Sequence, residues 1–311
     1  MSLVAPDDRM GLSLDATSHA TPASRTPGDR ARRAATVVTV VLLTALAVAA
    51  VAFWVTGGRW FVVRTPSMGT AAPVGTLVLT RPTTVAALHV GDVVAFHPTN
   101  AGALTYTHRV VAIRDGVVTT RGDINGSDDP WATTDRQLVG RAVSLLPGLG
   151  FLARALPLLV VGGLLVGGLT RWWLRPDRRG PARMAGFTAL YVVASLIVRP
   201  FVALVQLQTT TGVGVASITA VSTGILPVRV SALPGHGTAT PVHLGYGEVG
   251  TLEFSGAAAD DRYALMAHVD LSWAGWALLA LLWSLPMLWV VLVGFRRHAH
   301  PDFVAGVPDQ A

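Results

Sequence analysis

Four long apolar segments constrain the fold of this chain more than any other feature. A helix needs about 20 apolar residues to cross a bilayer, and each segment is about that long. These segments account for a hydrophobic content of 51% and a charged content of only 14%. We therefore predict four transmembrane helices, at residues 34–56, 149–170, 184–207 and 275–295. In the second, Gly163 and Gly167 have the spacing that lets another helix approach closely.

Arginine clusters flank these segments on one side only. Three arginines precede the first segment, five lie in residues 171–183, and Arg296-Arg297 follow the fourth. The positive-inside rule makes that side cytoplasmic, which predicts a multi-pass protein of the cell membrane. Because the net charge of +6 is concentrated beside apolar segments, it indicates contact with membrane lipids and not with nucleic acid. The expected cytoplasmic parts are a disordered tail (1–33), the arginine-rich loop (171–183) and a second tail (296–311).

Two polar segments, residues 57–148 and 208–274, read as β-rich domains on the outer face. Short apolar stretches alternate there with Gly, Pro, Asp and Thr, which is typical of strands and turns. The fold class expected is a membrane protein with a mostly-β domain outside and a second, smaller β-rich extracytoplasmic domain. In the first segment the candidate strands are Gly75–Thr80, Asp92–Phe96, Tyr106–Arg114, Val117–Arg121 and Leu138–Leu145.

Two residue types are missing, and their absence excludes several chemistries. Without cysteine there is neither a disulfide framework nor a thiolate zinc site. All 24 cationic residues counted as Lys plus Arg are arginine, so no mechanism with a neutral lysine amine is available. The histidines show no close metal-ligand spacing. We expect neither a metal nor a cofactor.

The first β-rich segment contains a serine, a histidine and aspartates in an order that suits a nucleophile, a base and an orienting group. Ser67 follows the first apolar segment closely, and His108 comes later in a candidate strand. Asp115-Gly116 is a strong two-residue hairpin signal between Val- and Ile-rich flanks. If no bulge intervenes, the register that this turn sets places Asp123 opposite His108.

These blocks resemble signal peptidase I of the endoplasmic-reticulum and archaeal subtype, which also occurs in Gram-positive bacteria. The resemblance covers about residues 35–150, and its blocks come in the family's order. They are Ser67-Met68, Gly91-Asp92-Val93-Val94, His108-Arg109-Val110, Gly122-Asp123-Ile124-Asn125 with Asp129, Gln137-Leu138-Val139-Gly140-Arg141 and Pro147-Gly148-Leu149-Gly150. One position departs from the family, because Thr70 stands where a proline is usual and proline comes only at Pro73.

The resemblance implies roles for five residues. Ser67 attacks the scissile carbonyl and His108 takes its proton, where the bacterial subtype uses a lysine. Asp129 is the implied third member and Asp123 a second required carboxylate; the hairpin register favours Asp123, so both stay candidates for the orienting group. Thr65 matches a position whose hydroxyl helps to bind the oxyanion, together with the backbone N–H of Ser67.

The resulting expectation is a membrane-bound serine endopeptidase that cleaves signal peptides from exported preproteins at the outer face. An extended peptide would add to a strand edge of the first β-rich domain. An alternative comes from a different class: a non-catalytic or bifunctional surface-assembly or adhesion protein that acts through residues 208–274. This segment lies beyond the resemblance and suggests either a partner or a restricted set of substrates.

Overall fold

The computed structural model describes residues 27–99, 102, 104–198, 201–212, 214–234, 238–257 and 263–295. The chain forms two compact units, residues 1–55 and 56–311. The described part of the first unit is one helix, α1 (Pro27–Val55). Of the two predicted tails, residues 1–26 and 296–311 lie outside the described residues, and residues 27–33 begin α1.

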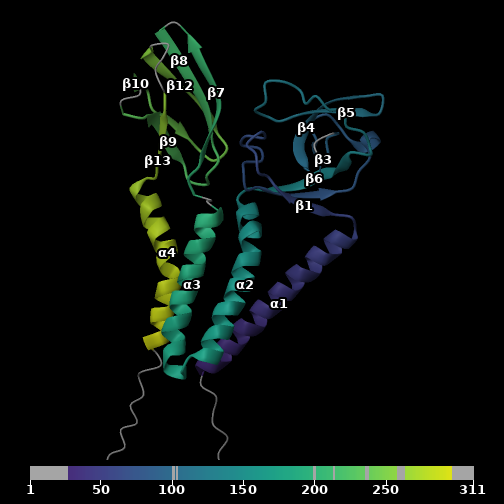
Figure 1. The fold of residues 1–311 in the computed structure, drawn as a ribbon. Coiled ribbons are helices and arrows are strands. Elements are labelled where there is room, and N and C mark those ends of the chain that lie inside the picture. Colours follow the sequence, from purple (N-terminus) through teal and green to yellow (C-terminus); the bar gives the residue numbers. More distant parts are fainter. Residues whose placement is uncertain are drawn as a thin grey trace, which may run out of the picture. The chain divides into compact units, whose positions relative to one another are not determined.

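The first β domain, residues 57–148, is a six-stranded antiparallel sheet with the strand order β1-β2-β6-β3-β4-β5 (Figure 1). Two apolar clusters form its core, one around Phe96 and Val110 and the other around Met68 and Val78. The mostly-β fold predicted for this segment is confirmed. The strands are β1 (Arg59–Val62), which the sequence pattern did not predict, β2 (Leu77–Arg81), β3 (Val93–Phe96), β4 (Tyr106–Arg114), β5 (Val117–Arg121) and β6 (Leu138–Leu146).

The hairpin of β4 and β5 turns at Asp115-Gly116, as predicted. Both residues have positive φ, 49° and 74°, which the tight turn requires. Near the turn the register also follows the prediction, with Arg114 opposite Val117. A β-bulge between Val110 and Ala112 then shifts the pairing by one residue. The predicted pairing of His108 with Asp123 is therefore wrong, because the extra residue in β4 shifts its register with β5 by one residue.

Two helices, α2 (Leu149–Trp173) and α3 (Pro176–Val198), are long and apolar enough to cross a membrane. In α1 and α4 (Trp273–Phe295), the apolar stretches that qualify among the described residues are shorter, Val40–Val55 and Trp273–Ser284. Length and composition thus support two of the four predicted spans. Most of the predicted cytoplasmic loop, residues 171–183, is helical, since only Leu174 and Arg175 separate α2 from α3.

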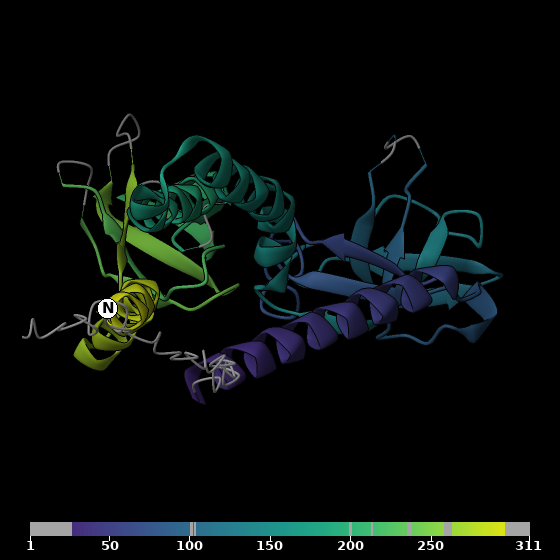
Figure 2. The ribbon, with the colours of Figure 1, turned by 90° about the horizontal axis from the view of Figure 1, so that it is seen from below.

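Because so short a link joins α2 and α3, the two helices run antiparallel, side by side (Figures 1 and 2). A Cβ at Gly162 would lie 2.4 Å from the Leu190 side chain, and one at Gly186 would lie 2.8 Å from Val166. Helices α2 and α3 therefore approach each other closely at Gly162 and Gly186. At Gly163 an added Cβ would meet only an ordinary contact, and at Gly167 it would meet nothing within 4 Å. On α4, Trp283 packs edge-on against Tyr191 of α3.

The second β domain, residues 201–272, is a sandwich of two antiparallel sheets, with strand orders β10-β12-β8-β7 and β11-β9-β13. One core joins the sheets, with Ile218 and Phe254 from the first and Val228 and Leu244 from the second. The second β domain begins earlier than predicted, because residues 204–207, which were expected to end the third span, form the start of β7. The strands are β7 (Leu204–Gly212), β8 (Gly214–Ser222), β9 (Val228–Ala232), β10 (Thr238–Ala239), β11 (Val242–Leu244), β12 (Val249–Ala257) and β13 (Leu265–Val269).

Replacing Phe254 tests this single core. Phe254 is 1% exposed, so Phe254→Ala leaves a cavity between the sheets and should lower the free energy of unfolding of the domain by about 3–5 kcal/mol. Val249→Ala in the same strand is the control, since Val249 is 40% exposed and its loss should cost under about 1 kcal/mol. Hydrogen exchange of the β8 and β9 amides in detergent micelles measures the loss of stability in each variant. Equal protection in the two variants would contradict a shared core.

Candidate active site

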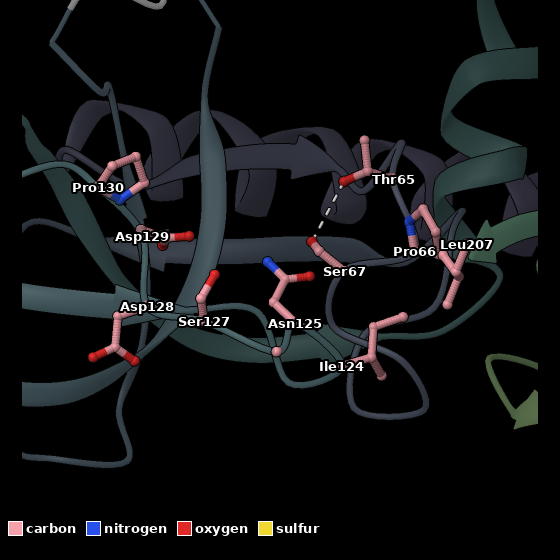
Figure 3. A pocket seen from close by; sticks show the side chains of 11 residues that line it. Thr65, Pro66, Ser67, Ile124, Asn125, Ser127, Asp128, Asp129, Pro130 and Leu207 are labelled. Carbon is pink, nitrogen blue, oxygen red and sulfur yellow. Dashed lines mark hydrogen bonds between the residues drawn. The ribbon is translucent and has the colours of Figure 1, made fainter. Parts of the chain in front are cut away.

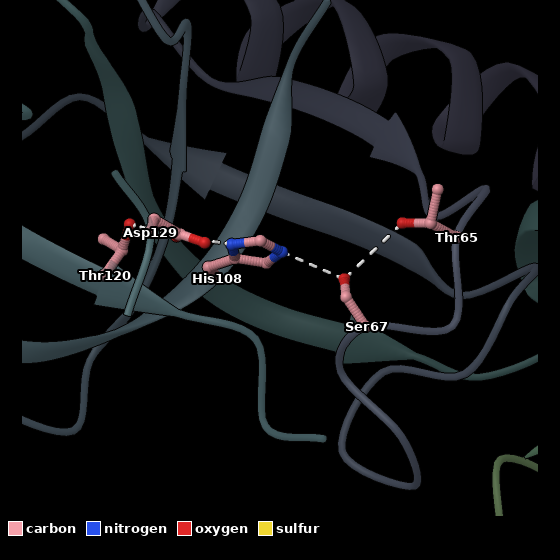
Figure 4. A network of polar contacts seen from close by, with 5 residues as sticks. All are labelled: Thr65, Ser67, His108, Thr120 and Asp129. Carbon is pink, nitrogen blue, oxygen red and sulfur yellow. Dashed lines mark hydrogen bonds and ion pairs between the residues drawn. The ribbon is translucent and has the colours of Figure 1, made fainter. Parts of the chain in front are cut away.

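Ser67 lies in the loop between β1 and β2, and its neighbour Met68 holds it there. Met68 is 1% exposed within the Val63–Val78 cluster, so its side chain anchors the loop in the core. The Ser67 carbonyl accepts a hydrogen bond of 3.0 Å from the amide of Ile124. Buried Met68 and the hydrogen bond from Ile124 both hold the backbone here, and the Ser67 side chain points into the site (Figure 4).

His108 projects from β4 toward Ser67. Its ring packs edge-on against Phe96 and Tyr106, with ring centroids 6.2 and 5.9 Å away. Only 6% of the side chain is exposed. With the ring packed in this way, Nε2 of His108 lies 3.0 Å from the Ser67 hydroxyl oxygen, a hydrogen-bonding distance (Figure 4). The imidazole is therefore positioned to accept the serine proton.

The other ring nitrogen of His108 faces Asp129. Nδ1 lies 2.6 Å from a carboxylate oxygen of Asp129, whose side chain is also 6% exposed. The Thr120 hydroxyl donates to the same oxygen at 2.5 Å, and the Asp129 amide donates to the Thr120 carbonyl at 2.8 Å. Thr120 of β5 thus holds Asp129 both by its carboxylate and by its backbone amide, and Figure 4 shows the threonine beside the carboxylate. A carboxylate on Nδ1 favours the tautomer that carries its proton there and leaves Nε2 free to accept another.

Asp123, the other candidate carboxylate, faces a different partner. It accepts two hydrogen bonds from the Arg109 guanidinium, at 2.8 and 2.6 Å. This contact raises the pKa of Arg109, chiefly through the side-chain hydrogen bond. Arg109 also donates to the Gly91 carbonyl at 2.9 Å. The pair of Arg109 and Asp123 therefore links β4 to the segment after β5, and Arg109 also links it to the turn before β3. The structure brings Asp129, not Asp123, to His108.

Thr65 lies on the far side of Ser67 from His108. Its hydroxyl oxygen is 3.5 Å from that of Ser67, at the limit of a hydrogen bond (Figure 4). Among the described residues, no backbone hydrogen bond uses the Ser67 amide. Of the two donors expected for an oxyanion site, the Thr65 hydroxyl thus lies near the serine oxygen, and the Ser67 N–H is engaged by no described backbone group.

An open cleft of about 540 Å³ runs past Ser67 (Figure 3). Asp128, Asp129 and Pro130 line it on one side of Ser67, and Pro66, Ile124 and Leu207 on the other. Asn125 and Ser127 lie along its length. Asp128, the aspartate next to Asp129, makes an exposed ion pair of 3.4 Å with Arg121. Within the described ranges, no cluster of three His, Asp or Glu side chains has the geometry of a metal site.

The site thus holds a hydroxyl, an imidazole and a carboxylate in one chain of hydrogen bonds beside an open cleft, an arrangement that can activate a hydroxyl as a nucleophile. Residues 33–128 match the family described as "Signal peptidase, peptidase S26". The match indicates a peptidase domain of a membrane-associated family. It includes Ser67, His108 and Asp123, and it ends one residue before Asp129. No curated protein matches the chain.

Three residues of the site were not predicted from the sequence. In the sequence, Thr120 looks like any other strand threonine. In the structure, the loop after β5 folds back onto it. Asn125 was noted only as part of a motif, and Leu207 was assigned to a helix. The only sequence signal for Thr120 was a threonine in a candidate strand, and a strand threonine by itself does not show whether its hydroxyl meets a carboxylate or water.

Thr120 is the most direct test of how the carboxylate is held. Because the residue is fully buried, Thr120→Val removes a hydroxyl from a charged acceptor and should lower the free energy of unfolding by about 1.5–3 kcal/mol. Thr119→Val, one residue away on the more exposed face of β5, is the matched control and should change it by under about 0.5 kcal/mol. Denaturant unfolding in micelles, followed by near-UV circular dichroism, compares them. Equal losses would refute the hydrogen bond to Asp129.

Proposed function

We propose that this chain is a membrane-bound serine endopeptidase of the signal peptidase I type, with Ser67 as nucleophile, His108 as general base and Asp129 as the orienting carboxylate. The observation that carries the proposal is the continuous chain of hydrogen bonds, 3.0 Å from Ser67 to His108 and 2.6 Å from His108 to Asp129. The match of residues 33–128 to a signal peptidase family supports the same reading.

In the proposed reaction, His108 Nε2 takes the Ser67 proton as the serine oxygen attacks the scissile carbonyl. Asp129 stabilises the imidazolium that forms and keeps its ring oriented. The Thr65 hydroxyl and the Ser67 N–H donate to the developing oxyanion. His108 then gives its proton to the leaving amine. A water molecule, activated by the same imidazole, hydrolyses the acyl-enzyme and restores the Ser67 hydroxyl.

The substrates that we propose are exported preproteins, cut at their signal peptides on the outer face of the membrane. The antiparallel pair α2 and α3 supports this placement, because β6 leads into the start of α2 and β7 follows the end of α3. Both β domains then emerge from the same face of the bilayer. The arginines near the α2–α3 link favour the cytoplasm for the opposite end.

Replacement of the nucleophile tests the activity itself. Ser67→Ala should abolish cleavage of a preprotein by the purified full-length protein in lipid vesicles, because the remaining groups have no nucleophile to activate. Ser127→Ala is the control, since Ser127 lines the same cleft and makes no contact with His108 among the described hydrogen bonds. Gel analysis of precursor and mature product measures both. Cleavage by Ser67→Ala at the wild-type rate would refute the proposal.

The two aspartates give a second, independent test. Asp129→Asn should lower kcat by roughly 10³- to 10⁴-fold, because an amide no longer favours the reactive tautomer or stabilises the imidazolium. Asp123→Asn breaks a partly exposed ion pair, so it should cost about 1 kcal/mol of stability or less and lower kcat by less than about tenfold. Single-turnover rates separate the two. The reverse ranking would assign the orienting role to Asp123.

A further inference from the structure

The second β domain reaches the cleft of the first. Leu207 of β7 lines the cleft together with Pro66 and Ile124, on the opposite side of Ser67 from Asp128 and Pro130 (Figure 3). These three side chains are apolar, whereas the other side carries two carboxylates. One end of the cleft therefore offers an apolar surface, and part of that surface comes from a domain that lies outside the family match.

The backbone of β7 is irregular at the residue that reaches the cleft. Gln206 pairs with Ala220 and Gln208 pairs with Thr219, so Leu207 is the extra residue of a β-bulge. A bulge leaves its extra residue out of the ladder and turns the side chain away from the regular alternation. The neighbouring strand β8 is regular at this point, so the irregularity belongs to β7 itself. This local feature presents Leu207 to the cleft.

A turn of the second β domain contacts the loop that carries the nucleophile. The Tyr246 hydroxyl donates to the Val74 carbonyl. Burial at this contact raises the pKa of Tyr246. Gly247, with φ of 82°, approaches so closely that an added Cβ would lie 2.6 Å from the Gly69 carbonyl oxygen. The two domains thus meet directly beside Ser67.

The contact also involves Pro73, in the loop that carries Ser67. Pro73 is buried, and its Cγ would lie 2.9 Å from a Cβ at Gly247. The loop therefore packs against the second β domain at Gly69 and Pro73. Loop and domain together determine where Leu207 lies relative to Ser67.

From these observations we infer that the second β domain is part of the substrate-binding site, where Leu207 forms the wall of a subsite for an aliphatic side chain of the substrate peptide. This inference rests on the proposed endopeptidase function and specifies its selectivity. The chemistry is direct, since an aliphatic side chain gains by leaving water beside Pro66, Ile124 and Leu207, whereas a charged one loses its hydration there.

The test is a cleavage profile over a peptide library that varies each position around the scissile bond, with the full-length protein in micelles. Leu207→Asp should lower kcat/KM by about tenfold or more for aliphatic residues at one position and raise the relative rate for arginine there. Val205→Asp is the matched control. It lies in the same strand with a similar exposure, 39% against 41%, and does not line the cleft, so its profile should equal that of the wild type.

Leu207→Ala and Leu207→Trp keep the test decisive if Leu207→Asp is inactive on every peptide. They should shift the preference at the same position toward larger and smaller side chains, respectively. Profiles equal to the wild type in these active variants would overturn the inference and leave the endopeptidase function intact. The same shift in Val205→Asp would also overturn it. Failure of the wild type to cleave, or cleavage by Ser67→Ala, would instead refute the proposed function.

Discussion

The hydrogen bond between His108 Nδ1 and Asp129 is the contact on which the candidate site depends. It joins two side chains that are each only 6% exposed, and at 2.6 Å it leaves the imidazole little freedom to turn. A buried carboxylate is costly unless it is hydrogen-bonded, and here Thr120 and the imidazole satisfy it. Because Nδ1 is occupied in this way, Nε2 is directed at Ser67.

The sheet supplies the two ends of this hydrogen-bonded chain from different edges of the domain. His108 belongs to β4, and Asp129 lies in the loop that folds back onto β5. Ser67 comes from the loop after β1, at the other edge of the sheet order, and buried Met68 anchors it. The core that surrounds Met68 therefore sets the distance from hydroxyl to imidazole as much as the strands do. In the proposed mechanism, loosening either support would lengthen the path of the proton.

The helices α2 and α3 and the second β domain extend this arrangement. The antiparallel pair of helices returns the chain to the end at which the first β domain lies. The β-sandwich that follows contacts the nucleophile loop through Tyr246 and Gly247 and lines the cleft with Leu207. An alternative role in surface assembly, suggested by the composition of residues 208–274, places no demand on a contact beside Ser67. The contact favours a role in substrate binding.

The amino-acid sequence alone determined the apolar segments of α2 and α3, the two β-rich segments and the turn at Asp115-Gly116, because hydrophobic periodicity and positive φ are local properties. It also brought Ser67, His108 and two aspartates forward as candidates. Only the tertiary structure shows that Asp129, and not Asp123, lies at His108. The bulge between Val110 and Ala112 changes the register that the turn alone would set, and the path of the loop after β5 carries Asp129 to His108.

Leu207 was wrongly assigned to a helix for a similar reason, since the apolar start of a strand just after a helix has the same composition as the helix. Register shifts, loop paths and contacts between domains depend on packing over long sequence separations, which no local pattern records.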